Sequence, residues 1–149
     1  MSLTTVRATE AISLGDLSFD LAPPELRRRG ERTIQEVERR VGELGSSAGA
    51  PSIASFVEPL NELLVRVTDV AAHGSLVFAV HPDPATRAAA REMSEAADRF
   101  FNAYRLNDTI YGRLGAVDAT REDPTTRFAL EKMLRDMRRA GVEKDPPTR

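Results

Sequence analysis

The chain has 149 residues, 41% hydrophobic and 30% charged, which suits one domain with a buried core. Its 21 basic and 23 acidic residues give a net charge of -2, which argues against a general nucleic-acid surface, because such surfaces are markedly basic. The sequence contains no cysteine, so disulfides, thiolate catalysis and cysteine-based zinc sites are excluded, and a reducing cytoplasmic location is expected.

Targeting and membrane segments are not expected. The amino-terminal residues lack the basic start and long apolar run of a signal peptide. No segment is expected to reach the roughly 18 apolar residues that a transmembrane helix needs. The sequence therefore predicts a soluble protein without a membrane partner.

The first helix is expected after an irregular lead-in at residues 1–22, which lacks sustained periodicity. Pro23 and Pro24 favour a helix start, because proline lacks a backbone donor that the first turn leaves unused. An apolar stripe with helical spacing follows, formed by Ile34, Val37, Val41 and Leu44. Residues 45–51 are rich in Gly, Ser and Ala and end in Pro51, which predicts a helix–helix connection rather than a linker between domains.

A second helix is expected to begin at Ser52 or Ser55, with Ser55 and Glu58 as a capping box. Its broad apolar face comprises Leu60, Leu63, Leu64, Val67, Val70 and Ala71. The pair His73-Gly74 resembles a helix end, so residues 75–80 are expected to form a short apolar connector.

Two Asp-Pro pairs predict the starts of later helices, at Asp83 and at Asp123, with a shorter helix or a continuation capped near Asn107 between them. Gly141 is expected to end the last helix, before a tail at residues 143–149. The expected buried faces are Ala89, Met93, Ala96, Ala97, Phe100, Phe101 and Tyr104 on the third helix, Ile110, Tyr111, Leu114 and Val117 on the shorter one, and Phe128, Leu130, Met133, Leu134 and Met137 on the last.

The fold class that follows is all-α. Ala, Arg, Glu and Leu dominate, whereas Tyr, Phe and Ile are sparse and Trp is absent, a composition that favours helix over strand. We expect four to five helices packed in a bundle-like array without a sheet, forming a single helical domain at residues 23–142.

The two histidines do not have the spacing of a helical metal site. A zinc-binding His-Glu-x-x-His pair places two imidazoles four residues apart on one helix, whereas His73 and His81 lie eight apart and are followed by Gly74 and Pro82. Capping or solvent exposure is the expected role of both.

Other polar groups also favour structural interpretations. The basic runs at 27–29 and 39–40 have acidic neighbours, which indicates a solvated face of ion pairs rather than an anion or RNA patch. Asp98, Asp108 and Glu122 lack metal-ligand spacing, and Ser46-Ser47 has no nearby base. Tyr104 and Tyr111, seven residues apart, suit the core or a rim contact. The sequence therefore predicts no catalytic, cofactor-binding or metal-binding residue in this chain.

Several stretches carry a family resemblance. After Phe19-Asp20 come Ile53-Ala-Ser-Phe-Val-Glu-Pro-Leu60, Leu76-Val-Phe-Ala-Val-His-Pro-Asp83, Tyr111-Gly-Arg-Leu-Gly-Ala-Val117 and Arg135-Asp-Met-Arg-Arg-Ala-Gly-Val142. In this order they resemble segments of the amino-terminal region of the thimet oligopeptidase and oligopeptidase A family. The resemblance covers residues 19–145, and no functional residue of the family falls within it.

The resemblance implies a non-catalytic, amino-terminal helical region of a zinc-dependent oligopeptidase that hydrolyses short peptides. In that family a His-Glu-x-x-His helix and a further carboxylate bind zinc on one half, and the amino-terminal half forms the opposite wall of the substrate channel. The implied partners are the missing catalytic half and the peptide substrate, with self-association of the isolated fragment. The alternative is a freestanding module for protein–protein interaction or oligomerisation that uses its Ala-Met-Phe face.

Overall fold

The computed structural model describes residues 21–144, and this part of the chain is helical without strands. Its elements are α1 (Pro23–Gly45), a π-helical turn η2 (Ile53–Val57) that continues directly into α2 (Glu58–Val80), α3 (Pro84–Arg105), α4 (Asp108–Gly115) and α5 (Pro124–Ala140). The predicted all-α class is confirmed. Residues 1–20 of the expected lead-in and 145–149 of the expected tail lie outside the described residues.

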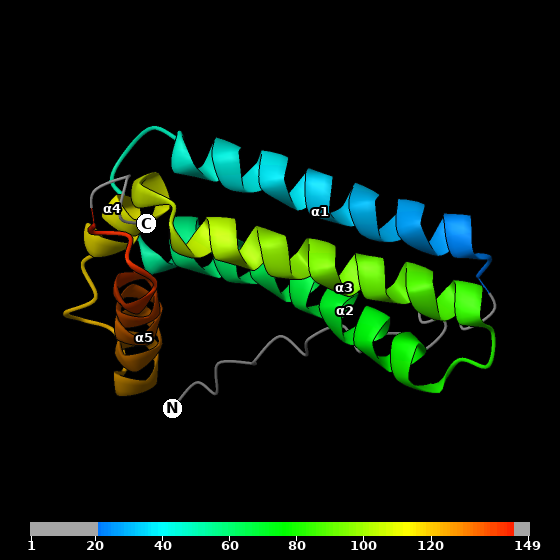
Figure 1. Ribbon diagram of the computed structural model, residues 1–149. Coiled ribbons are helices and arrows are strands. Elements are labelled where there is room, and N and C mark those ends of the chain that lie inside the picture. Colours follow the sequence, from blue (N-terminus) through cyan, green and yellow to red (C-terminus); the bar gives the residue numbers. More distant parts are fainter. Residues whose placement is uncertain (1–20, 145–149) are drawn as a thin grey trace, which may run out of the picture.

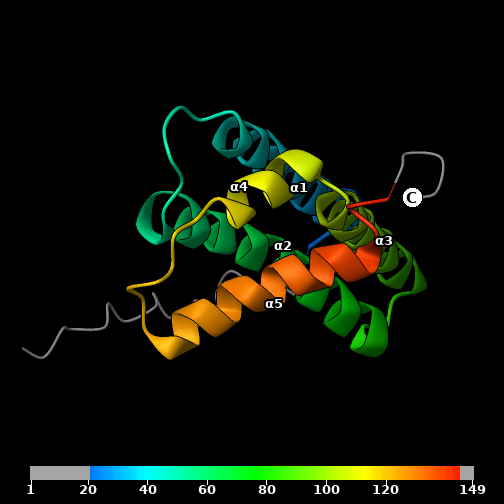
Figure 2. The ribbon, with the colours of Figure 1, turned by 90° about the vertical axis from the view of Figure 1, so that its left-hand side faces the viewer.

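Three long helices form the body of the molecule. Figure 1 shows α1, α2 and α3 side by side, with each running opposite to the helix before it. The helix α3 packs against both of the others. The short α4 and the final α5 gather at one end of this body, where α5 crosses the long helices at a steep angle (Figure 2). The arrangement is therefore a three-helix bundle with one end covered.

Local sequence signals account for most helix ends. The side chains of Asp83, Asn107 and Asp123 each accept a hydrogen bond from a backbone N–H in the first turn that follows, at 2.8, 3.0 and 2.8 Å. Such caps satisfy donors that have no partner within the helix. Gly141 ends α5 in the left-handed region, with a φ of 103°, where a side chain would be strained. These four predicted boundaries are confirmed.

The start of the second helix differs from the expected capping box. Ser52 is the N-cap: its Oγ accepts from the N–H of Ser55 at 3.2 Å, and the Oγ of Ser55 accepts from the N–H of Ser52 at 3.1 Å. Ser55 therefore already lies inside the helix, and the expected pairing of Ser55 with Glu58 is wrong. A π-helical turn separates this cap from Glu58, where the α-helical hydrogen bonding begins.

The end of α2 also differs from the expectation. The helix continues past His73 and Gly74 to Val80, so the predicted connector at residues 75–80 is wrong. Both residues are buried, and Gly74 lies where α2 meets α3. A Cβ at Gly74 would lie 2.7 Å from the carbonyl oxygen of Ala90 and would also clash with Ser94. The glycine therefore allows two helices to approach each other and does not terminate one.

The buried residues form two clusters. The main cluster lies toward the end covered by α4 and α5 and includes the fully buried Phe56, Leu60, Val67, Leu114 and Met137. The second cluster lies between α1, α2 and α3 and comprises Leu26, Val77, Ala89, Ala90 and Met93. Most expected apolar stripes are buried as predicted. Phe128 is the exception, because its side chain is 58% exposed on α5.

The packing at Gly74 makes a testable prediction. Replacing Gly74 with Ala is expected to lower the free energy of unfolding by about 1–3 kcal/mol, because the backbone of α3 must move to accommodate the methyl group. Gly42→Ala is the matched control: it lies on an exposed face of α1, and its added Cβ would have no neighbour within 4 Å. That variant should gain up to about 1 kcal/mol from helix propensity alone.

Urea unfolding followed by circular dichroism measures both variants. A Gly74→Ala protein as stable as the wild type would show that α2 and α3 are not in close contact there.

Candidate functional site

The two histidines have separate structural surroundings. His73 is 8% exposed within α2, so the expectation that it caps a helix or faces solvent is wrong. Burial, together with the nearby positive charge of Arg29, lowers the pKa of its imidazole. His81 follows α2, and its Nδ1 accepts a hydrogen bond from the N–H of Asp83 at 3.1 Å. His81 is also the C-cap of α2, where its backbone N–H donates to the carbonyl oxygen of Val77 at 2.9 Å, and this is the capping role that the sequence predicts.

A metal centre cannot be assembled from the side chains seen here. Within residues 21–144, no three His, Asp or Glu side chains gather closely enough to hold a metal ion. These residues include Asp98, Asp108 and Glu122, which the sequence offers as possible cation ligands. A zinc ion of the kind that the family resemblance implies therefore does not fit these residues, and no catalytic step is assigned to them.

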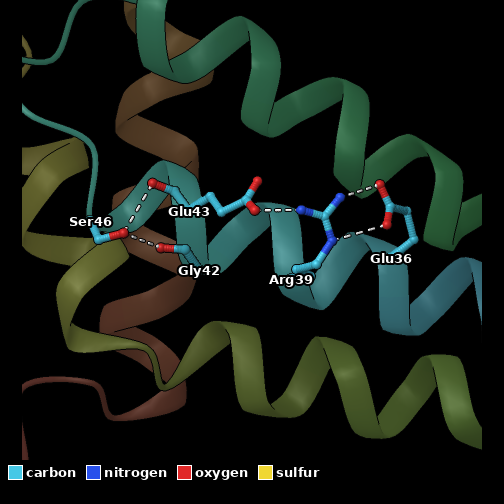
Figure 3. Close-up of polar contacts among 5 residues, drawn as sticks. All are labelled: Glu36, Arg39, Gly42, Glu43 and Ser46. Carbon is cyan, nitrogen blue, oxygen red and sulfur yellow. Dashed lines mark hydrogen bonds and ion pairs between the residues drawn. The ribbon is translucent and has the colours of Figure 1, made fainter.

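Three arginines of the basic runs, Arg27, Arg28 and Arg39, form ion pairs, and those of Arg28 and Arg39 lie within α1. Arg39 bridges Glu36, at 2.8 Å, and Glu43, so that one guanidinium holds two carboxylates on the same helix face (Figure 3). The hydrogen bond from Arg39 lowers the pKa of Glu36. Arg27 differs, because it pairs with Glu92 on α3 and so joins two helices. Since these side chains are exposed, each pair contributes little to stability.

The loop between α1 and η2 is fixed by an interaction that sequence analysis missed. Arg113 of α4 donates hydrogen bonds to the backbone oxygen of Ser47 at 2.9 Å and to its Oγ at 3.1 Å. The same guanidinium lies over the ring of Phe56, 5.0 Å from its centroid. Ser46 donates to the carbonyl groups of Gly42 and Glu43 in the last turn of α1 (Figure 3). Ser47 donates to the carbonyl group of Leu44 in the same turn. The two serines therefore have structural roles.

Tyr104 and Tyr111 both make contacts within the protein. Tyr104 stacks on Phe100 with ring centroids 6.4 Å apart, and burial raises its pKa to about 12. The hydroxyl of Tyr111 donates to the carboxylate of Glu143, beyond the end of α5. That hydrogen bond raises the pKa of Tyr111 and ties α4 to the turn in which Val142 is buried. Core packing and an internal contact thus account for both side chains.

Two grooves lie along α1. The larger, of about 390 Å³, runs between the end of α1 and the start of α2 and combines apolar and charged side chains. The other, of about 290 Å³, lies between α1 and α3, and the Arg27–Glu92 ion pair forms part of its lining. The first is lined by Arg40, Glu43, Leu44, Ser47, Pro59, Glu62, Leu63 and Arg66. Its volume is in the range of small-ligand sites. We call it the α1–α2 groove.

The helix α2 also carries uncovered apolar side chains. Val65, Leu76, Phe78 and Val80 are between 44% and 60% exposed. Val65, Leu76 and Val80 lie on one side of α2, because separations of 11 and 15 residues are close to whole turns of an α-helix. We call these three residues the exposed α2 stripe. Apolar surface of this kind is typical of protein–protein interfaces.

The length of α2 contradicts the expectation that no segment is long and apolar enough to cross a membrane. Because α2 does not end at His73, residues Ile53–Val80 form one continuous helix of 28 residues with a mean hydropathy of 1.5 over its most apolar 18-residue window. By length and composition alone it could cross a bilayer, a property shared with core helices of soluble proteins. Here 28% of the window is buried, other apolar side chains such as Leu63 and Leu64 pack partly buried against the main cluster, and the large apolar side chains that stay exposed are the four named above.

The chain is similar in sequence to known proteins that are named as peptidases. The chain is 27% identical over 133 residues to mitochondrial intermediate peptidase of Pongo abelii and 26% identical over 133 residues to the Homo sapiens protein of that name. Each match covers 86% of this chain but only 18% of the relative. No protein-family model and no solved structure matches the chain. The relatives' name is mitochondrial, which does not fit well with the expected cytoplasmic location.

The burial of His73 makes a prediction about pH. Because its folded-state pKa is lowered, the unfolded chain binds the proton more readily, so stability is full above about pH 6.5 and falls as the pH decreases. His73→Gln is expected to remove that loss between about pH 7.5 and 5.5, a window in which carboxylates stay ionised.

Urea midpoints of the wild type and the variant across this pH window measure the effect. An equal loss of stability in both proteins would place the responsible group elsewhere.

Proposed function

We propose that this chain is a non-catalytic helical region of a zinc-dependent oligopeptidase and forms one wall of the channel that admits short peptides. The observation that carries the proposal is the identity of 26–27% to peptidases over 86% of the chain. It is supported by the stretches between Ile53 and Val142 that resemble, in the same order, the amino-terminal region of the thimet oligopeptidase family.

Hydrolysis is assigned to a different part of the parent protein. In a zinc-dependent peptidase the zinc ion activates water and polarises the scissile carbonyl group. Residues 21–144 provide no set of ligands for such an ion. Since the chain spans only 18% of its relatives' length, the catalytic residues would belong to the much longer remainder of such a protein. The role of this chain would be to exclude folded substrates and to pack against the catalytic part.

The exposed α2 stripe supports such packing. Val65, Leu76 and Val80 leave apolar surface uncovered on a helix that is otherwise part of the core. A larger protein would bury this surface against another of its regions, gaining roughly 25 cal/mol per Å² of apolar area removed from water. The stripe is the surface on which we place the contact with the catalytic part.

A second candidate function uses the same surface. A freestanding interaction module was expected to use an Ala-Met-Phe face, but Ala89, Met93 and Phe100 on α3 are buried inside the bundle. A module of this kind would therefore have to bind its partner, or a second copy of the chain, through the exposed α2 stripe. Both functions thus predict that the stripe makes intermolecular or interdomain contacts.

The isolated chain is expected to self-associate through the exposed α2 stripe, and Leu76→Asp should weaken that association by about tenfold or more, because a charge replaces a side chain in an apolar contact. Ala88→Asp, on the exposed side of α3, is the matched control and should have no such effect.

Sedimentation velocity over a range of concentrations measures the association. Equal weakening by both substitutions would indicate a general effect of charge and not a specific surface.

Joining the chain to the catalytic part of a parent peptidase tests the channel-wall function. The joined protein is expected to cleave short quenched-fluorescent peptides efficiently while sparing a folded protein, whereas the catalytic part alone should select poorly by size. Leu76→Asp in the joined protein should weaken this selection, and Ala88→Asp should preserve it.

If activity and size selection are the same with and without this chain, the channel-wall function is wrong. Association of the isolated chain through α2 would then favour the interaction module.

A further inference from the structure

Leu21 brings the chain to the last turns of α2 just before α1 begins. Its side chain is half-buried and packs against the second cluster, to which Val77 of α2 belongs. Val77 is the sequence neighbour of Leu76 and lies three residues before Val80. Residues 1–20 are therefore joined to the described part of the chain close to the end of the exposed α2 stripe.

The side of α2 that carries Leu76 and Val80 is next to α1. Arg29 of α1 lies near enough to His73 for its positive charge to lower the pKa of the imidazole. Leu76 and Val80 follow His73 by three and seven residues, separations that place side chains on the same side of a helix. This uncovered part of α2 therefore borders the helix that Leu21 precedes.

The sequence that leads to Leu21 has the pattern of an extended chain with one apolar side. Leu17, Phe19 and Leu21 alternate with polar residues, and in an extended backbone alternate side chains point to the same side. Ala22 is itself extended, with a φ of -59° and a ψ of 145°, as expected before a proline. An extended chain before Leu21 would therefore present Leu17 and Phe19 on the side on which Leu21 packs.

We propose that Leu17 and Phe19 pack on the part of the exposed α2 stripe that follows Asp69, so that the chain covers this surface with its own amino-terminal segment. The surface comprises Leu76 and Val80, which are 44% and 60% exposed. Burying apolar side chains against each other removes both from water. The inference goes beyond the proposed function, since it holds whichever partner finally binds the stripe.

Asp69 decides which part of the stripe the segment covers. It is half-buried on the same side of α2, four residues after Val65 and seven before Leu76. The segment carries acidic side chains at Asp16 and Asp20, and like charges repel each other. Contact is therefore favoured beyond Asp69, toward the end of α2, and not around Val65.

The segment is long enough to reach this surface. Four residues of extended chain before Leu21 span roughly 13 Å, whereas Leu76 and Val80 lie about 6 Å apart along α2. Because the segment belongs to the same chain, its effective concentration at the stripe is of the order of 1 mM. It would therefore weaken, without abolishing, the association of copies through the stripe, and Val65 would stay uncovered.

Nuclear Overhauser measurements on the full chain test the contact directly. Contacts are expected between the ring of Phe19 and the methyl groups of Leu76 and Val80 within one chain. A sample mixed from isotope-labelled and unlabelled chains, which shows only contacts between copies, should lack them. The absence of these contacts within one chain, or their presence only between copies, would overturn the proposal.

Sedimentation velocity tests the competition with a second copy. Phe19→Asp should strengthen self-association by about tenfold, because it releases the end of the stripe. Leu3→Asp is the matched control: it adds the same charge to the same segment but lies outside the alternating pattern, so it should change little. In a chain that already carries Leu76→Asp, Phe19→Asp should have no further effect.

Equal effects of Phe19→Asp and Leu3→Asp, or weaker association of the Phe19→Asp protein, would contradict the proposal. The Overhauser contacts require neither association nor a catalytic part. A chain that shows them but stays monomeric in every variant would therefore keep the covered stripe and reject self-association, and loss of the channel-wall function would leave them unchanged.

Discussion

The close contact between α2 and α3 at Gly74 is the constraint on which the rest of the fold depends. Because Gly74 has no Cβ, the carbonyl group of Ala90 and the side chain of Ser94 can lie directly against α2. The small Ala89 and Ala90 complete this approach, and Val77 packs in the cluster that they form. The helix thereby continues to Val80 instead of ending at the glycine. Its full length, and the apolar surface it leaves uncovered, follow from this contact.

The α1–α2 groove depends on the opposite end of the bundle. There α4 and α5 cover the main cluster, and Arg113 reaches from α4 to the loop after α1. The position of Ser47, and with it one wall of the groove, is thus set by a residue 66 positions away in the sequence.

Local signals made much of the fold predictable, whereas contacts between distant residues did not. The caps at Asp83, Asn107 and Asp123 involve backbone groups two or three residues away, so their sequence patterns were sufficient. The expectation of a helix end at Gly74 is wrong because glycine can either end a helix or admit a neighbouring one, and only the position of Ala90 distinguishes the two.

The same limit applies to the candidate surfaces. Arg40 and Arg66 belong to different helices, and nothing in the spacing of 26 residues indicates that they line one groove. Phe128 fits the spacing of an apolar stripe, yet its side chain is exposed. It belongs to α5, which crosses the long helices at a steep angle (Figure 2). Helical periodicity predicts which residues share a face, but it does not predict how far the neighbouring helix extends along that face.

The turn after α5 has a mechanical consequence. Gly141 reverses the backbone, Val142 is buried, and Glu143 accepts a hydrogen bond from Tyr111. The polypeptide is therefore anchored to α4 almost up to the last described residue, without a hinge between α5 and that point. Any displacement of α4 relative to the long helices would therefore carry this turn with it, so α4, α5 and the turn up to Lys144 behave as one rigid unit.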